Sequence, residues 1–277
     1  MTWLAVKLAV ENEMASEAAR WLVEQTGQAV HEESSGKIVG VVESDSPVAE
    51  LQAQASARFG ASARVSFEPL PEIDWLIRWQ QGLATRRIGR LTLSPSWLVD
   101  TVAAGAKVLV IDPETAFGSG EHGSTRAALT LLDRFLQTGS SVVDLGSGSG
   151  ILTIAAALLG ARQAVGIEID ETAEPVAAQN IIHNGVGDRV TLLTGDAALL
   201  LPLVAPADLI TANILRSANE TLLPIIGGSL QSGGVAIFSG MEVPESGPFR
   251  ETLRQAGMEV LDEVVDEGWW AVAARVI

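Results

Sequence analysis

The chain has 277 residues, a formal net charge of −16 and no cysteine. Its length allows one large domain or two unequal domains. The absence of cysteine excludes disulfide bonds, thiolate metal ligands and thiol nucleophiles, and the presence of only three histidines argues against a structural zinc site. The negative charge opposes contact with nucleic-acid phosphates and favours a basic protein partner. We therefore expect no metal site and no direct nucleic-acid binding.

The first ten residues, MTWLAVKLAV, lack a basic leader and are interrupted by Lys7. This pattern predicts a strand rather than a signal peptide. No apolar run approaches the roughly 20 residues that are needed to cross a bilayer. We expect a cytoplasmic protein without membrane contact, and no feature of the sequence demands more than a monomer.

Residues 1–68 alternate between strand-like and helix-like segments. The segments WLAVKLAV, QAVHE, KIVGVVE and ARVSFEPL are typical of strands, and ENEMASEAARWLVEQ and SPVAELQAQASARF are typical of helices. The resulting order, βαββαβ, predicts a small ferredoxin-like α+β domain. Residues 69–90 then contain two prolines, a short tryptophan-bearing helix and a cluster of three arginines, which predict a linker.

Residues 91–277 alternate between short β-rich runs and helical runs. This alternation predicts an α/β fold with a doubly wound, mostly parallel sheet. The end of the chain departs from the alternation, because MEVLDEVVDEG and WWAVAARVI are two consecutive strands. We expect them to form an antiparallel hairpin at the edge of the sheet.

The stretch VVDLGSGSGIL contains a glycine turn formed by Gly146, Gly148 and Gly150. Ile151 occupies the position where a dinucleotide fingerprint has its last glycine, and no lysine followed by serine or threonine closes a phosphate-binding P-loop. Asp144 precedes the turn, and its carboxylate is expected to face the ligand and repel a pyrophosphate. S-adenosylmethionine suits this place because it has an adenosine moiety, two cationic groups and no phosphate.

Polar residues follow the next three predicted strands. Glu168 ends AVGIE, where an acid can accept hydrogen bonds from both ribose hydroxyls. Asp196 in LTGDA could meet the adenine edge, or it could simply cap a helix. Asn213 in DLITAN points at the crevice where open α/β sheets bind ligands, or it could satisfy a turn.

With these residues in place, the sequence resembles the PrmA family, the methyltransferases of ribosomal protein L eleven (L11). The loop IDPETAFGSGEHGSTRAAL resembles the family pattern D-P-G-x-A-F-G-T-G-x-H-x-T-T. The glycine turn VVDLGSGSGILTIAA resembles L-D-x-G-C-G-S-G-I-L-x-I-A-A, and ANIL, FSG and GWWAV agree further along. The order and spacing of these motifs make the resemblance specific over nearly the whole chain.

The resemblance implies a class I methyltransferase domain and an N-terminal domain that recognises the ribosomal protein. It implies transfer of methyl groups from S-adenosyl-L-methionine to amino groups of L11, which are lysine side chains, the N-terminal α-amine or both. The implied cofactor contacts include Thr125 in the loop, the glycine turn and Glu168. Asn213 would lie near the transferred methyl and aim the amine.

Two residues of the glycine-rich loop each have two alternative roles. Phe117 could pack on the cofactor or anchor the loop in the core. His122 could act as a general base, since its pKa lies near working pH, or it could order the loop over the cofactor. Several positions depart from the family pattern: Glu114 replaces a glycine, Ser147 a cysteine and Glu168 an aspartate, Gly123 and Ser124 loosen the end of the loop, and Arg216 follows ANIL.

Other functions are compatible with part of this pattern. A lysine methyltransferase of a different protein, such as a flavoprotein subunit, would have the same fold. A nucleic-acid base methyltransferase is disfavoured, because ANIL stands where such enzymes carry N-P-P-Y and the chain has no tyrosine to stack on a flipped base. The spacing of the glycines disfavours a nicotinamide oxidoreductase, and the retained motifs disfavour a binding module without activity.

Overall fold

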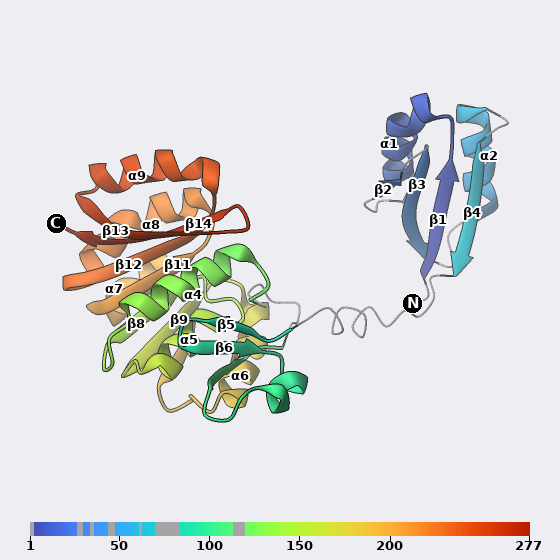
Figure 1. Ribbon diagram of the computed structural model, residues 1–277. Coiled ribbons are helices and arrows are strands. Elements are labelled where there is room, and N and C mark those ends of the chain that lie inside the picture. The colour runs from blue at the N-terminus through green and yellow to red at the C-terminus, as the bar shows by residue number, and fades with distance from the viewer. Residues whose placement is uncertain are drawn as a thin grey trace. The chain divides into compact units, whose positions relative to one another are not determined.

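The computed structural model describes residues 3–26, 30–33, 36–43, 48–60, 63–69, 84–112 and 120–277. The chain divides into two compact units, residues 1–82 and 83–277 (Figure 1). None of the helices within these described ranges is long and apolar enough to cross a membrane.

The first unit has a four-stranded antiparallel sheet in the order β2-β3-β1-β4, with two helices packed on it (Figure 1). Buried Val6 and Leu8 alternate along β1, and Trp21 meets Phe59 edge-to-face at a centroid distance of 5.4 Å. This order confirms the predicted ferredoxin-like fold. The elements are β1 (Trp3–Ala9), α1 (Ala15–Thr26), β2 (His31–Glu33), β3 (Lys37–Glu43), α2 (Val48–Phe59) and β4 (Arg64–Pro69), with a 3₁₀ turn at Asn12–Met14.

The second unit is built on a seven-stranded sheet in the order β10-β9-β8-β11-β12-β14-β13. The first five strands are parallel, and β14 lies antiparallel to both β12 and β13. The predicted parallel sheet with an antiparallel C-terminal hairpin is confirmed. The strands are β8 (Ser141–Leu145), β9 (Gln163–Glu168), β10 (Val190–Thr194), β11 (Ala207–Asn213), β12 (Leu230–Glu242), β13 (Met258–Asp266) and β14 (Trp269–Val276).

Helices cover both faces of this sheet, because its parallel strands are apolar on both sides (Figure 1). One core contains side chains of α4, α5 and α6, and the other contains side chains of α7, α8 and α9. The helices are α4 (Gly123–Phe135), α5 (Ile151–Leu159), α6 (Glu174–His183), α7 (Ala197–Val204), α8 (Arg216–Ser229) and α9 (Ser246–Gln255), with 3₁₀ turns at Ser96–Thr101, Glu171–Ala173 and Val243–Glu245.

A separate three-stranded sheet precedes the main one, and the sequence did not indicate it. It consists of β5 (Arg86–Ile88), β6 (Leu91–Ser94) and β7 (Lys107–Val110), with β5 antiparallel and β7 parallel to β6. Its inner face joins the core that contains α4 and α5. Of the predicted linker, residues 70–83 lie outside the described residues, and Arg86–Ile88 forms β5.

Candidate functional site

The glycine turn connects β8 to α5 at the carboxyl end of the sheet. Gly146, Gly148 and Gly150 have φ values of 69°, 50° and 79°, a left-handed backbone that glycine adopts without strain. The Gly146 N–H donates to the Ile167 carbonyl of β9 at 2.8 Å. A Cβ at Gly146 would lie 2.4 Å from Cγ2 of Ile214. The turn therefore needs glycine for its backbone angle and also for the space in front of it.

Glu168, at the end of β9, holds this turn in place. Its Oε2 accepts a hydrogen bond from the Gly148 N–H at 2.8 Å, and its Oε1 accepts from the N–H groups of Ile169 and Asp170 at 2.9 and 3.0 Å. A carboxylate has about four lone-pair sites, so capacity for further donors remains. Glu168 thus orders the glycine turn from the neighbouring strand.

The expectation that Asp144 faces the ligand is wrong. Its side chain is 1% exposed, and its two oxygens accept hydrogen bonds from the hydroxyls of Thr153 and Thr211 at 2.8 and 2.7 Å. Burial raises the pKa of Asp144 to about 6, although both threonine hydrogen bonds act in the opposite direction. The carboxylate is turned into the sheet because two hydroxyls on neighbouring elements satisfy it there.

A small crevice lies beside Glu168 and between the ends of β9 and β10. Oγ of Ser147, within this crevice, is buried and has no hydrogen-bond partner among the described residues. Glu174, which the sequence did not indicate as a site residue, also lines the crevice and accepts from the Thr194 hydroxyl at 2.9 Å. Asp196 is outside the lining and caps α7 by accepting from the Ala198 N–H at 2.8 Å.

Asn213, the last residue of β11, meets Thr125 in the first turn of α4. Its Nδ2 donates to the Thr125 hydroxyl at 3.3 Å, and Thr125 is fully buried. The other amide atom, Oδ1, is buried and makes no hydrogen bond within the described part of the chain. A buried acceptor without a partner costs about 1–3 kcal/mol, so this atom indicates a place where a ligand donates.

A pocket of about 450 Å³ opens beside Asn213. We call it the Asn213 pocket. Its walls are mainly apolar, and its few polar groups come from the start of α4 and from Asn213 itself. It could therefore hold an aliphatic side chain that carries one polar group at its end. The lining residues are His122, Ser124, Asn213, Ile214, Leu215, Ala218, Gly240 and Trp269.

Buried hydrogen bonds fix the wall of this pocket. The Asn219 side chain donates to the carbonyls of Ile214 and Ser239, both at 3.1 Å, and the Ser239 hydroxyl donates to the Ser124 carbonyl at 2.9 Å. A Cβ at Gly240 would lie 2.4 Å from the Ile214 carbonyl oxygen. The ends of β11 and β12 and the start of α4 are thereby held together around Asn213.

His122 lies at the entrance to α4 and packs on the C-terminal hairpin. Its Nδ1 is 2.7 Å from the Ser124 hydroxyl, and its ring centroid is 4.2 Å from that of Trp269. Burial, together with the nearby charge of Arg126, lowers the pKa of His122. The ring is therefore neutral at pH 7 and forms part of the pocket wall.

Arg126 fastens the start of α4 to the β13–β14 turn. It is 5% exposed, pairs with the Asp266 carboxylate at 2.5 and 2.9 Å and with Glu267 at 2.8 Å, and donates to the Glu121 carbonyl. A Cβ at Gly123 would lie 2.4 Å from the Asp266 carbonyl oxygen. The sequence predicted that Gly123 loosens the loop. In the structure, the lack of a side chain at Gly123 instead lets the hairpin turn pack against it.

Of the remaining departures from the family pattern, the structure describes Arg216 but not Glu114. Arg216 lies in the first turn of α8 and pairs with Glu220 and Glu245 at 3.7 and 3.4 Å, on the surface. Glu114 and Phe117 lie outside the described residues.

The structure thus brings the predicted residues into two groups. Gly148 and Glu168 share one crevice, with Gly146 in the same glycine turn, and Thr125 and Asn213 share a hydrogen bond beside the Asn213 pocket. Sequence reasoning gave no role to Trp269, although it had singled out the GWWAV motif that contains this residue.

Comparison with known proteins places these features in one family. The family model described as "Ribosomal protein L11 methyltransferase (PrmA)" matches residues 2–276. A ribosomal protein L11 methyltransferase of Pelotomaculum thermopropionicum is 38% identical over 218 residues, which are 78% of this chain and 70% of that protein. Another from Synechococcus sp. (strain RCC307) is 37% identical over 232 residues, 82% of this chain and 77% of that protein.

A solved structure agrees with the sequence relatives. The crystal structure of ribosomal protein L11 methylase from Lactobacillus delbrueckii subsp. bulgaricus matches with a TM-score of 0.63 and 27% identity, covering 70% of this chain and all of that one. These likenesses establish a methyltransferase that uses S-adenosylmethionine as its methyl donor. They do not favour the alternative of a flavoprotein subunit as substrate. The chain belongs to the ribosomal protein L11 methyltransferase (PrmA) family.

Proposed function

We propose that this protein transfers methyl groups from S-adenosylmethionine to amino groups of ribosomal protein L11, on lysine side chains, the N-terminal α-amine or both. The observation that carries the proposal is the Asn213 pocket, whose walls are mainly apolar and whose lining residue Asn213 has a buried amide oxygen without a hydrogen-bond partner among the described residues. The family match over residues 2–276 supports the identity of the substrate.

The residues of the crevice suit the cofactor. Gly148 lines the crevice at the carboxyl end of β8, and Glu168 retains lone pairs for the ribose hydroxyls. Thr125 and Asn213 would contact its methyl-bearing end, Asp196 the adenine edge, and Phe117 the loop side. When bound, S-adenosylmethionine supplies a methyl group on a positively charged sulfur that can be displaced directly.

The protein's task at the other end is to present a neutral amine. A lysine of pKa about 10.4 costs about 4 kcal/mol to deprotonate near pH 7.4, and an α-amine of pKa about 8 costs well under 1 kcal/mol. The apolar walls of the Asn213 pocket disfavour the charged ammonium. Asn213 Oδ1 would then accept a hydrogen bond from the amine and aim its lone pair, which is the alignment that direct displacement requires.

The N-terminal unit, with its ferredoxin-like fold, would recognise L11 and deliver its amino groups to the second unit. The net charge of −16 supports a basic ribosomal protein as partner. On this proposal the enzyme acts as a monomer in the cytoplasm, where ribosomal proteins are made.

Labelling of a whole proteome tests the choice of substrate. The full-length protein is incubated with methyl-labelled S-adenosylmethionine and an extract of cells from which the endogenous enzyme of this family has been deleted. L11 should be the labelled protein. Labelling of another protein, with L11 left unlabelled, would retain the methyltransferase and reject the proposed substrate.

A further inference from the structure

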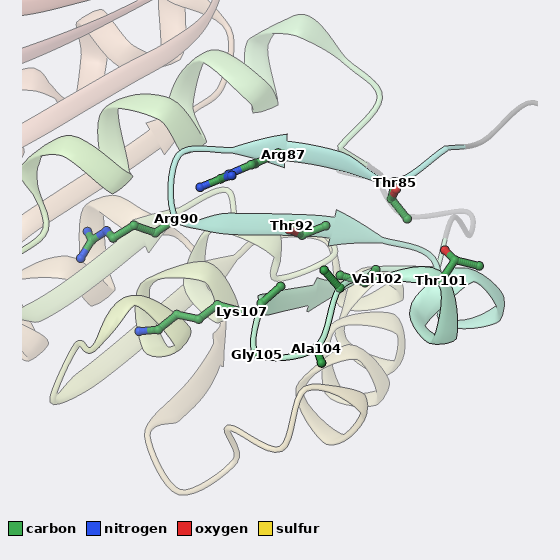
Figure 2. Close-up of a pocket in the computed structure, with 11 residues that line it drawn as sticks. Thr85, Arg87, Arg90, Thr92, Thr101, Val102, Ala104, Gly105 and Lys107 are labelled. Atoms are coloured by element: carbon green, nitrogen blue, oxygen red, sulfur yellow. The ribbon is translucent and has the colours of Figure 1, made fainter.

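A groove of about 650 Å³ runs along the small β5–β6–β7 sheet, and three basic side chains line it (Figure 2). Arg87 comes from β5, Arg90 from the β5–β6 turn and Lys107 from the start of β7, so the three lie at the same end of the sheet. We call it the basic groove. The lining residues are Thr85, Arg87, Arg90, Thr92, Thr101, Val102, Ala103, Ala104, Gly105, Ala106 and Lys107.

Two of the three cations have no carboxylate partner. Arg90 pairs with Asp133 at 2.7 Å. Arg87 donates only to the Gly89 carbonyl at 3.3 Å, and Lys107 only to the Leu158 carbonyl at 3.2 Å; within the described ranges neither makes an ion pair. Acidic residues outnumber basic ones by 34 to 18, so carboxylates are plentiful in this chain. The positive charge of these two groups is therefore available to a ligand.

Strand register places Arg87 on the open side of the sheet, whereas Lys107, which pairs with Leu91, reaches the groove from the start of β7. Arg87 pairs across the strands with Thr92, and Thr92 with Val108, so the three share one face. Ile88 and Leu91, which alternate with them, are buried on the opposite face. Arg87 is consequently exposed beside the half-buried hydroxyl of Thr92.

The net charge of the chain does not cancel this local charge. Residues 84–107 contain four basic residues and one acidic residue. Interactions between exposed charges are largely screened beyond about 8 Å at physiological ionic strength. A ligand in the basic groove therefore responds mainly to the groups in and beside it; the described residues that line it include no aspartate or glutamate, and Asp133 beside it pairs with Arg90.

We propose that the basic groove binds phosphate groups of an RNA chain. A guanidinium fork and an ammonium are the groups that phosphate oxygens prefer, and the Thr92 hydroxyl can add a donor. No aromatic side chain among the described residues lines the groove, so these residues offer no platform for stacked bases, and the contact that they make is independent of RNA sequence. This inference rests on the proposed function, because a ribosomal substrate brings the enzyme beside RNA. It replaces the expectation of no nucleic-acid contact with one weak, local and salt-dependent contact.

RNA binding by the full-length protein tests the proposal. Fluorescence anisotropy of a labelled oligouridine is followed at several salt concentrations for the wild type, R87Q/K107Q and the charge-matched control R254Q/R275Q. The control arginines are exposed and paired with Glu251 and Glu259. Loss of two phosphate contacts should reduce the salt slope by about 1.4 and lower affinity about 20-fold at 0.1 M salt. The control should bind like the wild type.

Methyl transfer to free L11, measured on the same samples, separates this proposal from the proposed function. R87Q/K107Q should methylate free L11 at the wild-type rate. A wild type that methylates L11 but binds no oligouridine would overturn the RNA contact alone, as would equal losses in both double variants. Binding of a polyglutamate peptide in preference to oligouridine would show an acidic protein partner instead. A wild type that transfers no methyl to L11 would reject the proposed function, on which the inference rests.

Discussion

Asn213 Nδ2 donates to the Thr125 hydroxyl at 3.3 Å, across 88 positions of sequence, and leaves Asn213 Oδ1 buried without a partner. In this orientation the amide nitrogen faces Thr125 and the amide oxygen faces away from it. Its orientation matters because Asn213 lines the Asn213 pocket, where a substrate amine would need an acceptor.

Replacing this acceptor should impair turnover far more than cofactor binding. We expect Asn213→Ala to lower kcat by about 10²-fold, the usual effect of removing one preorganised polar group at a reacting centre. The Kd for S-adenosylmethionine, measured by calorimetry, should change less than threefold (an order-of-magnitude bound). Asn213→Asp keeps an acceptor oxygen and should lose less than the alanine variant. Equal losses in kcat and cofactor affinity would reduce Asn213 to a cofactor contact.

Gly146→Ala should distort the glycine turn that carries the crevice residues Ser147 and Gly148, and Gly139→Ala provides the matched control. Both glycines have left-handed φ, 69° and 88°, so both substitutions incur about 1–2 kcal/mol of backbone strain. Only at Gly146 does the new Cβ meet a neighbour, Ile214, whereas Gly139 faces open space. Calorimetry should show a loss of cofactor affinity for Gly146→Ala alone. Similar affinities in the two variants would contradict the crevice assignment.

Arg126→Gln should destabilise the second unit and raise KM. Removing one partner of a buried pair costs about 3–5 kcal/mol, and the partial exposure of Asp266 and Glu267 places this case at about 2–3 kcal/mol. Urea unfolding measures it, with exposed Arg275→Gln as a control that changes stability by less than about 1 kcal/mol. If both variants unfold at the same urea concentration, the ion pairs of Arg126 contribute nothing to stability.

The same pair predicts a pH dependence. Arg126 lowers the pKa of Asp266 below its value in the unfolded chain. The stabilisation is therefore present above the unfolded pKa, which is about 3.9, and is lost as pH falls through the folded value. Wild type and Arg126→Gln should converge in stability at strongly acid pH, and a difference in stability that stays constant across the acid range would contradict this.

His122→Gln should leave the shape of the pH–rate profile unchanged. Burial and Arg126 hold the pKa of His122 below 6.5, so the ring is already neutral where a lysine is methylated. A neutral ring that packs on Trp269 orders the pocket, and its loss should raise KM for L11. A pH–rate limb that disappears in His122→Gln would instead identify it as the general base.

Asp144→Asn should reduce the dependence of the free energy of unfolding on pH in the acid range. Burial raises the pKa of Asp144 to about 6, above the unfolded value of about 3.9, so the native state binds more protons between these limits. Its contribution is fully present below the unfolded pKa and is lost as pH rises through about 6, a change of about 3 kcal/mol. Urea unfolding midpoints of the variant and of the wild type, measured from about pH 4 to about pH 7 so that they span both pKa values, give the difference in stability.

Several features of the fold were predictable because they depend on short-range pattern. Alternating apolar residues gave the order of strands and helices in both units, and the two consecutive strands at the end gave the hairpin. The left-handed backbone of Gly146, Gly148 and Gly150 explains why this turn is visible in the sequence.

What depends on long-range packing was not predictable. Asp144 turns into the sheet because the Thr211 hydroxyl, 67 positions away in sequence, donates to it together with the hydroxyl of Thr153. The role of Gly123 follows only from the approach of the β13–β14 turn. The three-stranded sheet uses strands of three or four residues, too short to show a pattern.

Intact-mass spectrometry of purified, unmethylated L11 incubated with the enzyme and S-adenosylmethionine tests the central claim most directly. We predict mass gains in steps of one methyl group with the wild type, and gains at least tenfold slower (an order-of-magnitude bound) with Asn213→Ala. An L11 mass that does not change under wild-type enzyme that binds the cofactor would contradict the account.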